Sequence, residues 1–229
     1  MVRDQDRQLA VHLEREAGVH IERATVAWCF DLAHWGRCGL GEDEASALAA
    51  LAKETGLAAS RFEVVERIAG DERAFQRDRL PATAAETQRT VAILRSMRPR
   101  TMRLVASATA DELDWRDPER RLSSWARWHS LRQIAWHLAD TESRYYLPSL
   151  GERPLPRGGD LLAELDASHR HVLATIAALP PDRIVRDRDG EWTTVKLLRR
   201  LAWHERSELR VMRRLLSRAR TLMAGVPEP

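Results

Sequence analysis

Two histidines end the two copies of a repeated sequence motif, here called the repeated phrase, in the C-terminal half of the chain. Residues 125–137 read WARWHSLRQIAWH and residues 192–204 read WTTVKLLRRLAWH, so that both fit the pattern W-x5-L-R-x-[I/L]-A-W-H. Each phrase leads into an apolar-periodic segment, which places His137 and His204 about two turns into a predicted helix. Glu208 follows four residues after His204, and residues four apart share one helix face. Two such helices facing each other would bring two imidazoles and a carboxylate to one point.

Two imidazoles and one carboxylate, with open positions for water or substrate, are typical of catalytic zinc and non-haem iron sites. The sequence therefore predicts a divalent metal ion held by His137, His204 and Glu208, with zinc, nickel, iron and manganese as candidates. Nearby carboxylates could provide the outer hydrogen bonds that orient imidazole ligands, namely those of Asp140, Glu142 and Glu205. The alternative is that both histidines pack in an apolar core, or that they belong to a site that has lost its metal.

Helices must position these ligands. From about residue 81 onward the apolar periodicity predicts four of them, over about residues 83–108, 130–147, 160–179 and 194–223. Pro99 is expected to kink or split the first helix, and Pro148 to stop the second. Four helices of this length joined by turns favour an antiparallel four-helix bundle, in which facing helices build metal sites. His137 and His204 should then meet in the interior of the bundle.

The N-terminal part has a different pattern. Residues 8–69 contain strand-like runs rich in β-branched residues, together with an amphipathic helix that ends at Gly56. The sequence thus predicts a mainly α protein with a small α+β domain at 1–79 and the four-helix bundle at 80–229, joined by the polar stretch 70–82. The core of the small domain should use five apolar side chains, those of Val11, Val26, Trp28, Leu48 and Leu51.

Composition narrows the class of protein further. No run approaches the roughly 20 apolar residues of a membrane span, and the N-terminus lacks the apolar core of a signal peptide, so we expect a cytoplasmic protein. The two cysteines, Cys29 and Cys38, are too few for a disulfide framework. A formal net charge of +3 in 229 residues gives nucleic-acid binding little support. We expect a small-molecule substrate, and the oligomeric state is open, a homodimer included.

Residues 82–222 resemble the DinB-like superfamily of four-helix-bundle metalloproteins. Its members place one histidine on the second helix and an H-x3-H pair on the fourth, after a Trp-Ser/Thr start that is here the Trp-Thr at 192–193. His137 and His204 match the first two ligands, whereas Glu208 stands where the third histidine is usual. The resemblance implies a metal-dependent enzyme that uses a low-molecular-weight thiol, such as bacillithiol, mycothiol or glutathione, for transfer or isomerisation. In that chemistry the metal stabilises the thiolate as nucleophile.

A second resemblance concerns the N-terminal domain. It is similar to the HicB-like small domains in a strand end, a cysteine-bearing turn and a helix opening, which are here Asp31-Leu32, Cys38, and Gly41-Glu42 with Ala45. The Pro-Gly that usually follows the Asp-Leu pair is replaced in this chain. A function of another class is therefore also open. In it the protein is a non-catalytic binding or regulatory module, whose N-terminal domain contacts a partner and whose bundle is a scaffold with a degenerate metal site.

Overall fold

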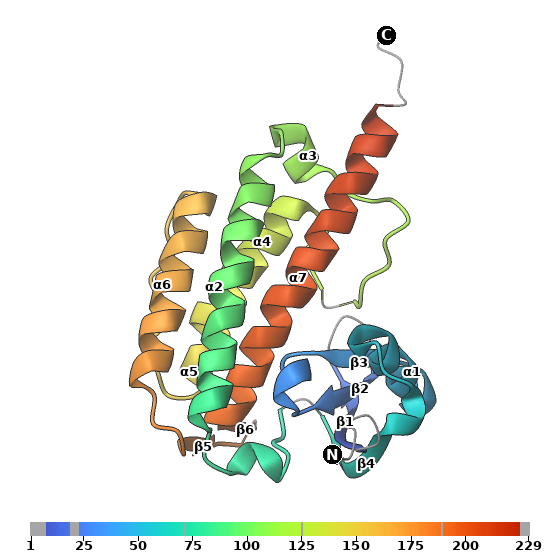
Figure 1. Ribbon diagram of the computed structural model, residues 1–229. Coiled ribbons are helices and arrows are strands. Elements are labelled where there is room, and N and C mark those ends of the chain that lie inside the picture. The colour runs from blue at the N-terminus through green and yellow to red at the C-terminus, as the bar shows by residue number, and fades with distance from the viewer. Residues whose placement is uncertain (1–7, 19–22, 71, 125, 189, 225–229) are drawn as a thin grey trace, which may run out of the picture. The chain divides into compact units, whose positions relative to one another are not determined.

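The computed structural model describes residues 8–18, 23–70, 72–124, 126–188 and 190–224, and its contacts divide the chain into two units. The first, here called the sheet unit, comprises residues 1–90 and 180–203. The second, here called the helical unit, comprises residues 91–179 and 204–229. The predictions of a mainly helical chain and of a small N-terminal sheet are confirmed (Figure 1). The antiparallel four-helix arrangement stays a prediction.

The sheet unit is built on four strands, which are β1 (Leu9–Ala17), β2 (Ala24–Cys29), β3 (Cys38–Gly41) and β4 (Phe62–Ala69). Their order is β3-β2-β1-β4, with β1 parallel to β4 and the other pairs antiparallel. Helix α1 (Glu44–Thr55) ends at Gly56, whose φ of 74° is the left-handed conformation that glycine adopts without strain. Short 3₁₀ turns lie at Leu32–His34, Ala59–Arg61 and Arg77–Arg79. The predicted helix stop at Gly56 is confirmed.

The sheet has an apolar cluster on each face, because successive residues of a strand point to opposite sides. Val11 of β1 packs with Leu51 of α1 on one face. Val26 and Trp28 of β2 belong to the cluster on the other face. These four predicted core residues are buried, whereas Leu48 is only partly buried against the α1 cluster.

Buried charges join β1 to the first turns of α7 (Thr194–Met223) within the sheet unit. Glu14 accepts hydrogen bonds from Arg199 at 3.2 Å and from Arg200 at 3.0 Å. It also accepts one from the indole Nε1 of Trp28 at 2.9 Å. Asp78 is the second carboxylate of the group, and it accepts from Arg199 at 2.8 Å. Two buried carboxylates thus face two buried guanidiniums, which satisfies the requirement that interior charges be paired.

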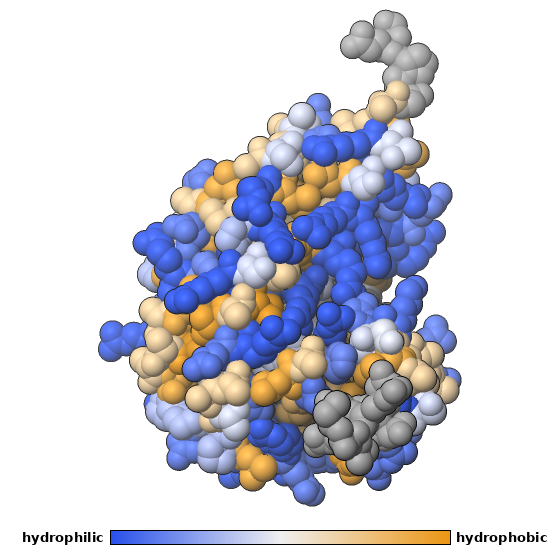
Figure 2. All heavy atoms as spheres, in the orientation of Figure 1, coloured by the Kyte–Doolittle hydropathy of each residue, from blue (hydrophilic) through white to orange (hydrophobic). Residues whose placement is uncertain are grey.

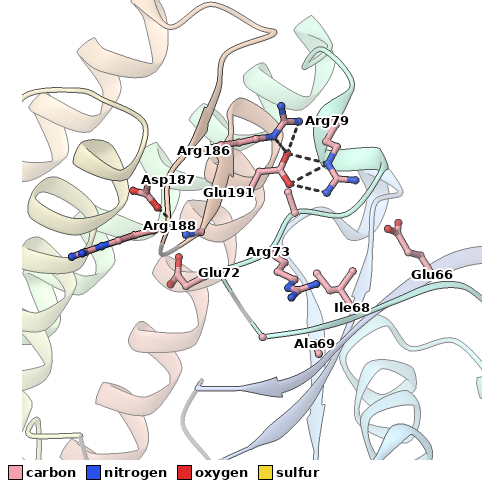
Figure 3. Close-up of a pocket in the computed structure, with 13 residues that line it drawn as sticks. Glu66, Ile68, Ala69, Glu72, Arg73, Arg79, Arg186, Asp187, Arg188 and Glu191 are labelled. Atoms are coloured by element: carbon pink, nitrogen blue, oxygen red, sulfur yellow. Dashed lines mark hydrogen bonds and ion pairs between the residues drawn. The ribbon is translucent and has the colours of Figure 1, made fainter.

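A short hairpin precedes α7 in the sheet unit and consists of β5 (Ile184–Arg186) and β6 (Glu191–Thr193). Figure 3 shows the carboxylate of Glu191 between Arg79 and Arg186, with N–O distances of 2.7 Å and 2.8 Å. Trp192 donates its Nε1 hydrogen to Glu72 at 2.8 Å. The sequence did not indicate this hairpin, because strands of three residues are too short to show an alternating pattern.

The helical unit contains α3 (Ala110–Asp114), α4 (Leu131–Asp140), α5 (Leu147–Ser149), α6 (Leu161–Ala178) and most of α2 (Ala84–Ala106) and α7. A π-helical segment, Thr141–Tyr146, connects α4 to α5. Pro99 lies inside α2, which continues past it, so the helix is not split there. Pro148 lies inside α5, and the helical stretch ends one residue later, at Ser149. Neither α3 nor the π-helical segment had a sequence signal that we recognised.

The core of the helical unit follows the helical repeat. Leu131, Ile134 and Leu138 are spaced three and four residues apart on α4, and all three are fully buried. They belong to one apolar cluster with Leu165 of α6 and Met212 of α7. This spacing turns one face of α4 toward the interior. His137 lies one position before Leu138, next to that face.

Among the described residues, no helix combines the length and the apolar character that crossing a bilayer requires. The exposed large apolar side chains are scattered along the chain, at Leu32, Val65, Leu80, Tyr145, Leu222 and Met223. On the face that Figure 2 shows, hydrophilic residues are interspersed with apolar ones.

The predicted domains, 1–79 and 80–229, are drawn differently from the contact units, since residues 180–203 belong to the sheet unit. Whether residues 80–229 fold alone is a question of stability, and it stays a prediction that they do. Expressed by itself, this fragment should unfold cooperatively in urea, as followed by far-UV circular dichroism. A fragment with no cooperative transition, beside a full-length chain that has one, would show that residues 180–203 need the N-terminal strands to fold.

The charge cluster of the sheet unit yields a stability prediction. The buried Arg199 and Arg200 share the carboxylate of Glu14, which the substitution Glu14→Ala removes. Because this leaves buried charge without its partner, we expect the free energy of unfolding to fall by about 3–5 kcal/mol. Urea denaturation of the two proteins measures it. Glu63→Ala, on the exposed side of β4, is the matched control and should leave the midpoint unchanged. Equal midpoints for the Glu14 and Glu63 variants would contradict the assignment.

Candidate metal centre

Two helices of the helical unit carry the predicted ligands. His137 lies in the last turn of α4, a helix that begins with a capping box between Ser130 and Gln133. His204 and Glu208 lie one turn apart on α7. His204 and Glu208 are almost fully buried, at 2% and 1% exposure, and His137 is partly exposed. The site is thus reached from the side of His137.

The three side chains converge as the sequence predicted. The Nε2 atoms of His137 and His204 are 3.4 Å apart, and Nε2 of His204 is 3.9 Å from Oε1 of Glu208. All three potential ligand atoms lie within 4.8 Å of one another. An ion with metal–nitrogen bonds of about 2.0–2.1 Å in tetrahedral geometry separates its ligand atoms by about 3.3 Å. The two imidazoles already have this separation, and Glu208 needs only a small movement to reach it.

Outer partners determine which imidazole nitrogen faces the centre. Nδ1 of His204 lies 3.3 Å from Oε1 of Glu142, and Nδ1 of His137 lies 3.1 Å from the hydroxyl of Thr141. An ionised carboxylate can only accept a hydrogen bond, so Nδ1 of His204 carries the proton and Nε2 presents its lone pair. The same assignment for His137, with Thr141 accepting, aims a second lone pair at the first. Two lone pairs at this separation repel each other unless a cation lies between them.

Of the three carboxylates considered as outer partners, only Glu142 contacts a ligand histidine. Asp140 instead pairs with Arg144 at 2.8 Å and with Arg157 at 3.3 Å. Glu205 pairs with Arg98 at 2.8 Å. Glu142 belongs to the π-helical segment, which also places the ring of Tyr146 with its centroid 5.6 Å from that of His204. Single π-helical turns are frequent at functional sites, and this one carries Glu142, one of the three carboxylates that the sequence indicated.

Burial changes the acidity of these groups. It raises the pKa of the Glu208 carboxyl to about 8, an effect that the guanidinium of Arg120 opposes. The pKa values of Glu142 and Glu205 are also raised by burial, and Arg98 opposes the shift in both. Buried carboxyls of this kind gain most from a nearby cation, because it stabilises the charged form that the interior penalises.

An indole covers one side of the site. The ring of Trp128 stacks on His137, with centroids 3.7 Å apart and planes inclined by only 9°. Trp136 and Trp203 precede the two histidines in the sequence, and each contacts other groups. Trp136 lies under the guanidinium of Arg157 at 4.5 Å, and Trp203 belongs to an apolar cluster of the sheet unit. Trp125, which opens the first copy of the phrase, lies outside the described residues.

A cavity of about 550 Å³ in the sheet unit, shown in Figure 3, is a second candidate for a functional site. Its carboxylates are already engaged. Glu191 binds Arg79 and Arg186, Glu72 accepts from Trp192, and Asp187 accepts from the backbone of Gly190. Such a set of ion pairs and caps explains the cavity walls without a ligand. The converging groups of the helical unit are the stronger candidate site.

Comparison with solved structures finds a likeness for part of the chain. One solved structure that the chain is similar to is described as "YfiT from Bacillus subtilis is a probable metal-dependent hydrolase with an unusual four-helix bundle topology". The two are 19% identical, the match covers 59% of this chain and 89% of that chain, and the TM-score is 0.47. At this score the likeness carries no argument about activity. No curated protein matches the sequence.

A family model gives the stronger result. The model of the DinB superfamily matches residues 93–212, just over half of the chain, and this stretch contains His137, His204 and Glu208. The HicB-like resemblance of the N-terminal domain has no counterpart in the comparisons and stays a prediction. On the strength of the family match, the chain belongs to the DinB superfamily.

Proposed function

We propose that this protein is a metal-dependent enzyme in which His137, His204 and Glu208 hold one divalent ion. The observation that carries the proposal is the pair of imidazole Nε2 atoms 3.4 Å apart, each turned to the other by an outer partner at Nδ1. A shared cation explains this separation, because the lone pairs of both Nε2 atoms would bind it.

Charge supports the same conclusion. The buried ionisable groups of the helical unit's described residues include three carboxylates and one guanidinium, which are those of Glu142, Glu205, Glu208 and Arg98. Their formal charges sum to −2, and the sum remains negative when the partly exposed Arg120 is added. The other buried carboxylate, Glu164, pairs with Arg144 at 2.5 Å. An interior with excess negative charge favours a cation over water.

The chain's own residues define what the centre can do. Three protein ligands leave at least one position open for a small molecule, which is the arrangement of catalytic rather than structural sites. When bound, the metal lowers the pKa of a thiol or water and polarises a carbonyl. Glu142 orients His204, and the indole of Trp128 stacks on the ring of His137. The substrate is therefore proposed to be a small molecule.

The leading version of the reaction is thiol chemistry, an S-transfer or isomerisation with a low-molecular-weight thiol as nucleophile. It follows from membership in the superfamily together with the resemblance described above. The second version is hydrolysis, which the donor set favours, because two histidines and one glutamate form the ligand set of several zinc hydrolases. The carboxylate at position 208 also tilts metal preference from zinc or nickel toward harder ions such as iron(II) or manganese.

Cobalt(II) substitution separates the two versions. Cobalt(II) reports its ligands through its visible and near-ultraviolet spectrum, so addition of glutathione to the cobalt protein should produce a thiolate-to-cobalt charge-transfer band if the thiol version is right. The S-methylated glutathione is the matched control and should leave the spectrum unchanged. An unchanged spectrum with glutathione, beside a metal stoichiometry of one, would favour hydrolysis instead.

Glu208 is the ligand at which this chain departs from the superfamily's usual histidine. Glu208→Ala should weaken metal affinity by about 100-fold or more, while Glu208→His should retain or increase affinity for zinc, because two imidazoles at i,i+4 fit one ion. Isothermal titration of the metal-free proteins with zinc and manganese measures both effects. Glu119→Ala, on the exposed surface of the same unit, is the control and should bind as the wild type does.

Affinity unchanged in Glu208→Ala but lost in His204→Ala would leave a site of two histidines and contradict the three-ligand model. Affinity that is absent from the wild type as well would favour the non-catalytic alternative, a binding module with a degenerate site.

A further inference from the structure

One arginine lies at the centre of the helical unit. The side chain of Arg98, in α2, is fully buried, and its guanidinium donates three hydrogen bonds to three different helical segments. Nε donates to Glu205 of α7 at 2.8 Å, and a terminal nitrogen donates to the backbone oxygen of Leu165 in α6 at 2.8 Å. The other terminal nitrogen donates to Glu142 of the π-helical segment at 2.6 Å.

Glu142 connects Arg98 to the candidate metal centre. Arg98 binds Oε2 of Glu142, and the other oxygen of that carboxylate, Oε1, lies 3.3 Å from Nδ1 of His204. The opposite ring nitrogen of His204 is the proposed ligand atom. A rotation of the Glu142 carboxylate would therefore turn the imidazole, and Arg98 is the group that prevents the rotation.

A purely structural role explains these contacts less well. Joining helices requires no buried charge, and buried ion pairs contribute little stability compared with apolar packing of the same volume. Glu205 also keeps one buried oxygen, Oε2, without a hydrogen-bond partner among the described residues. The guanidinium is thus shared between two carboxylates in a way that costs stability and fixes the geometry of Glu142. Planar, multidentate arginine is suited to such orientation.

We propose that Arg98 is a positioning residue of the metal centre, which holds Glu142 so that His204 keeps its proton on Nδ1 and directs Nε2 to the ligand point. The inference rests on the proposed function. It adds Arg98 to the residues of the site, although neither the repeated motif nor the spacing of the ligands indicates it. The orienting partners of metal-bound histidines typically contribute about 10- to 100-fold to metal affinity.

The test uses Arg98→Lys, Glu142→Gln and the double variant in the full-length chain. Lysine keeps the positive charge but is a point donor that cannot bind three acceptors in one plane, so Arg98→Lys separates orientation from charge. Each single variant should lower zinc affinity by about 10- to 100-fold. Because Arg98 acts through Glu142, the double variant should lose no more than the weaker-binding single variant, which is the signature of coupling. Arg144→Lys is the control, since Arg144 pairs with Asp140 and Glu164 and contacts none of the proposed ligands. The zinc affinity of this variant should stay within twofold of the wild-type value.

A second readout needs no metal. In ¹⁵N NMR of the metal-free protein, His204 should be in the Nδ1–H tautomer in the wild type and in Arg144→Lys. In Arg98→Lys and in Glu142→Gln it should become a mixture of tautomers. Glu142→Gln leaves Arg98 paired with Glu205, so it tests the relay even if the arginine variant fails to fold.

The outcomes distinguish the role of Arg98 from the proposed function on which it rests. Wild-type protein that binds no metal overturns the proposed function. Wild-type binding together with unchanged affinity and an unchanged His204 tautomer in Arg98→Lys overturns only the role of Arg98. Additive losses in the double variant would also overturn it, because they would show that Arg98 and Glu142 act independently.

Discussion

Burial of like charges is the constraint on which the helical unit depends. Glu142, Glu205 and Glu208 lie in its interior, and Arg98 is the one fully buried guanidinium among the described residues of this unit. An excess of buried carboxylate is costly unless a proton or a cation offsets it. Burial raises the pKa values of all three carboxyls, which is the direction that this cost predicts. A divalent ion between the ligands removes that cost.

The sheet unit meets the same constraint by pairing its buried charges. Its buried Glu14 and Asp78 face Arg199 and Arg200, so that carboxylates and guanidiniums are equal in number and within hydrogen-bond distance. The repeated phrase of the sequence illustrates the difference. Its second copy supplies Arg199 and Arg200 to the balanced cluster of the sheet unit and His204 to the unbalanced interior of the helical unit. One short motif therefore contributes two arginines to the stability of the sheet unit and, at its end, a histidine to the candidate site.

The sequence was sufficient to predict that the three candidate ligands converge, but not to predict their surroundings. Spacing of four residues placed His204 and Glu208 on one face of α7, and the repeated phrase indicated His137. Arg98 and Trp128 gave no signal, because a buried arginine and a stacked indole are read from sequence as surface and core. The π-helical segment also escaped notice, since it depends on packing around Thr141–Tyr146 and not on local propensity. Among the outer carboxylates, only the fold could select Glu142 over Asp140.

Elemental analysis of the purified full-length protein tests the central claim most directly. The account predicts about one divalent ion per chain, retained through gel filtration, and a loss of that ion in both His137→Ala and His204→Ala. A control substitution outside the helical unit, Glu63→Ala, should retain it. A wild-type protein that carries no stoichiometric zinc, nickel, iron or manganese, and takes up none when titrated with each of them, would contradict the account.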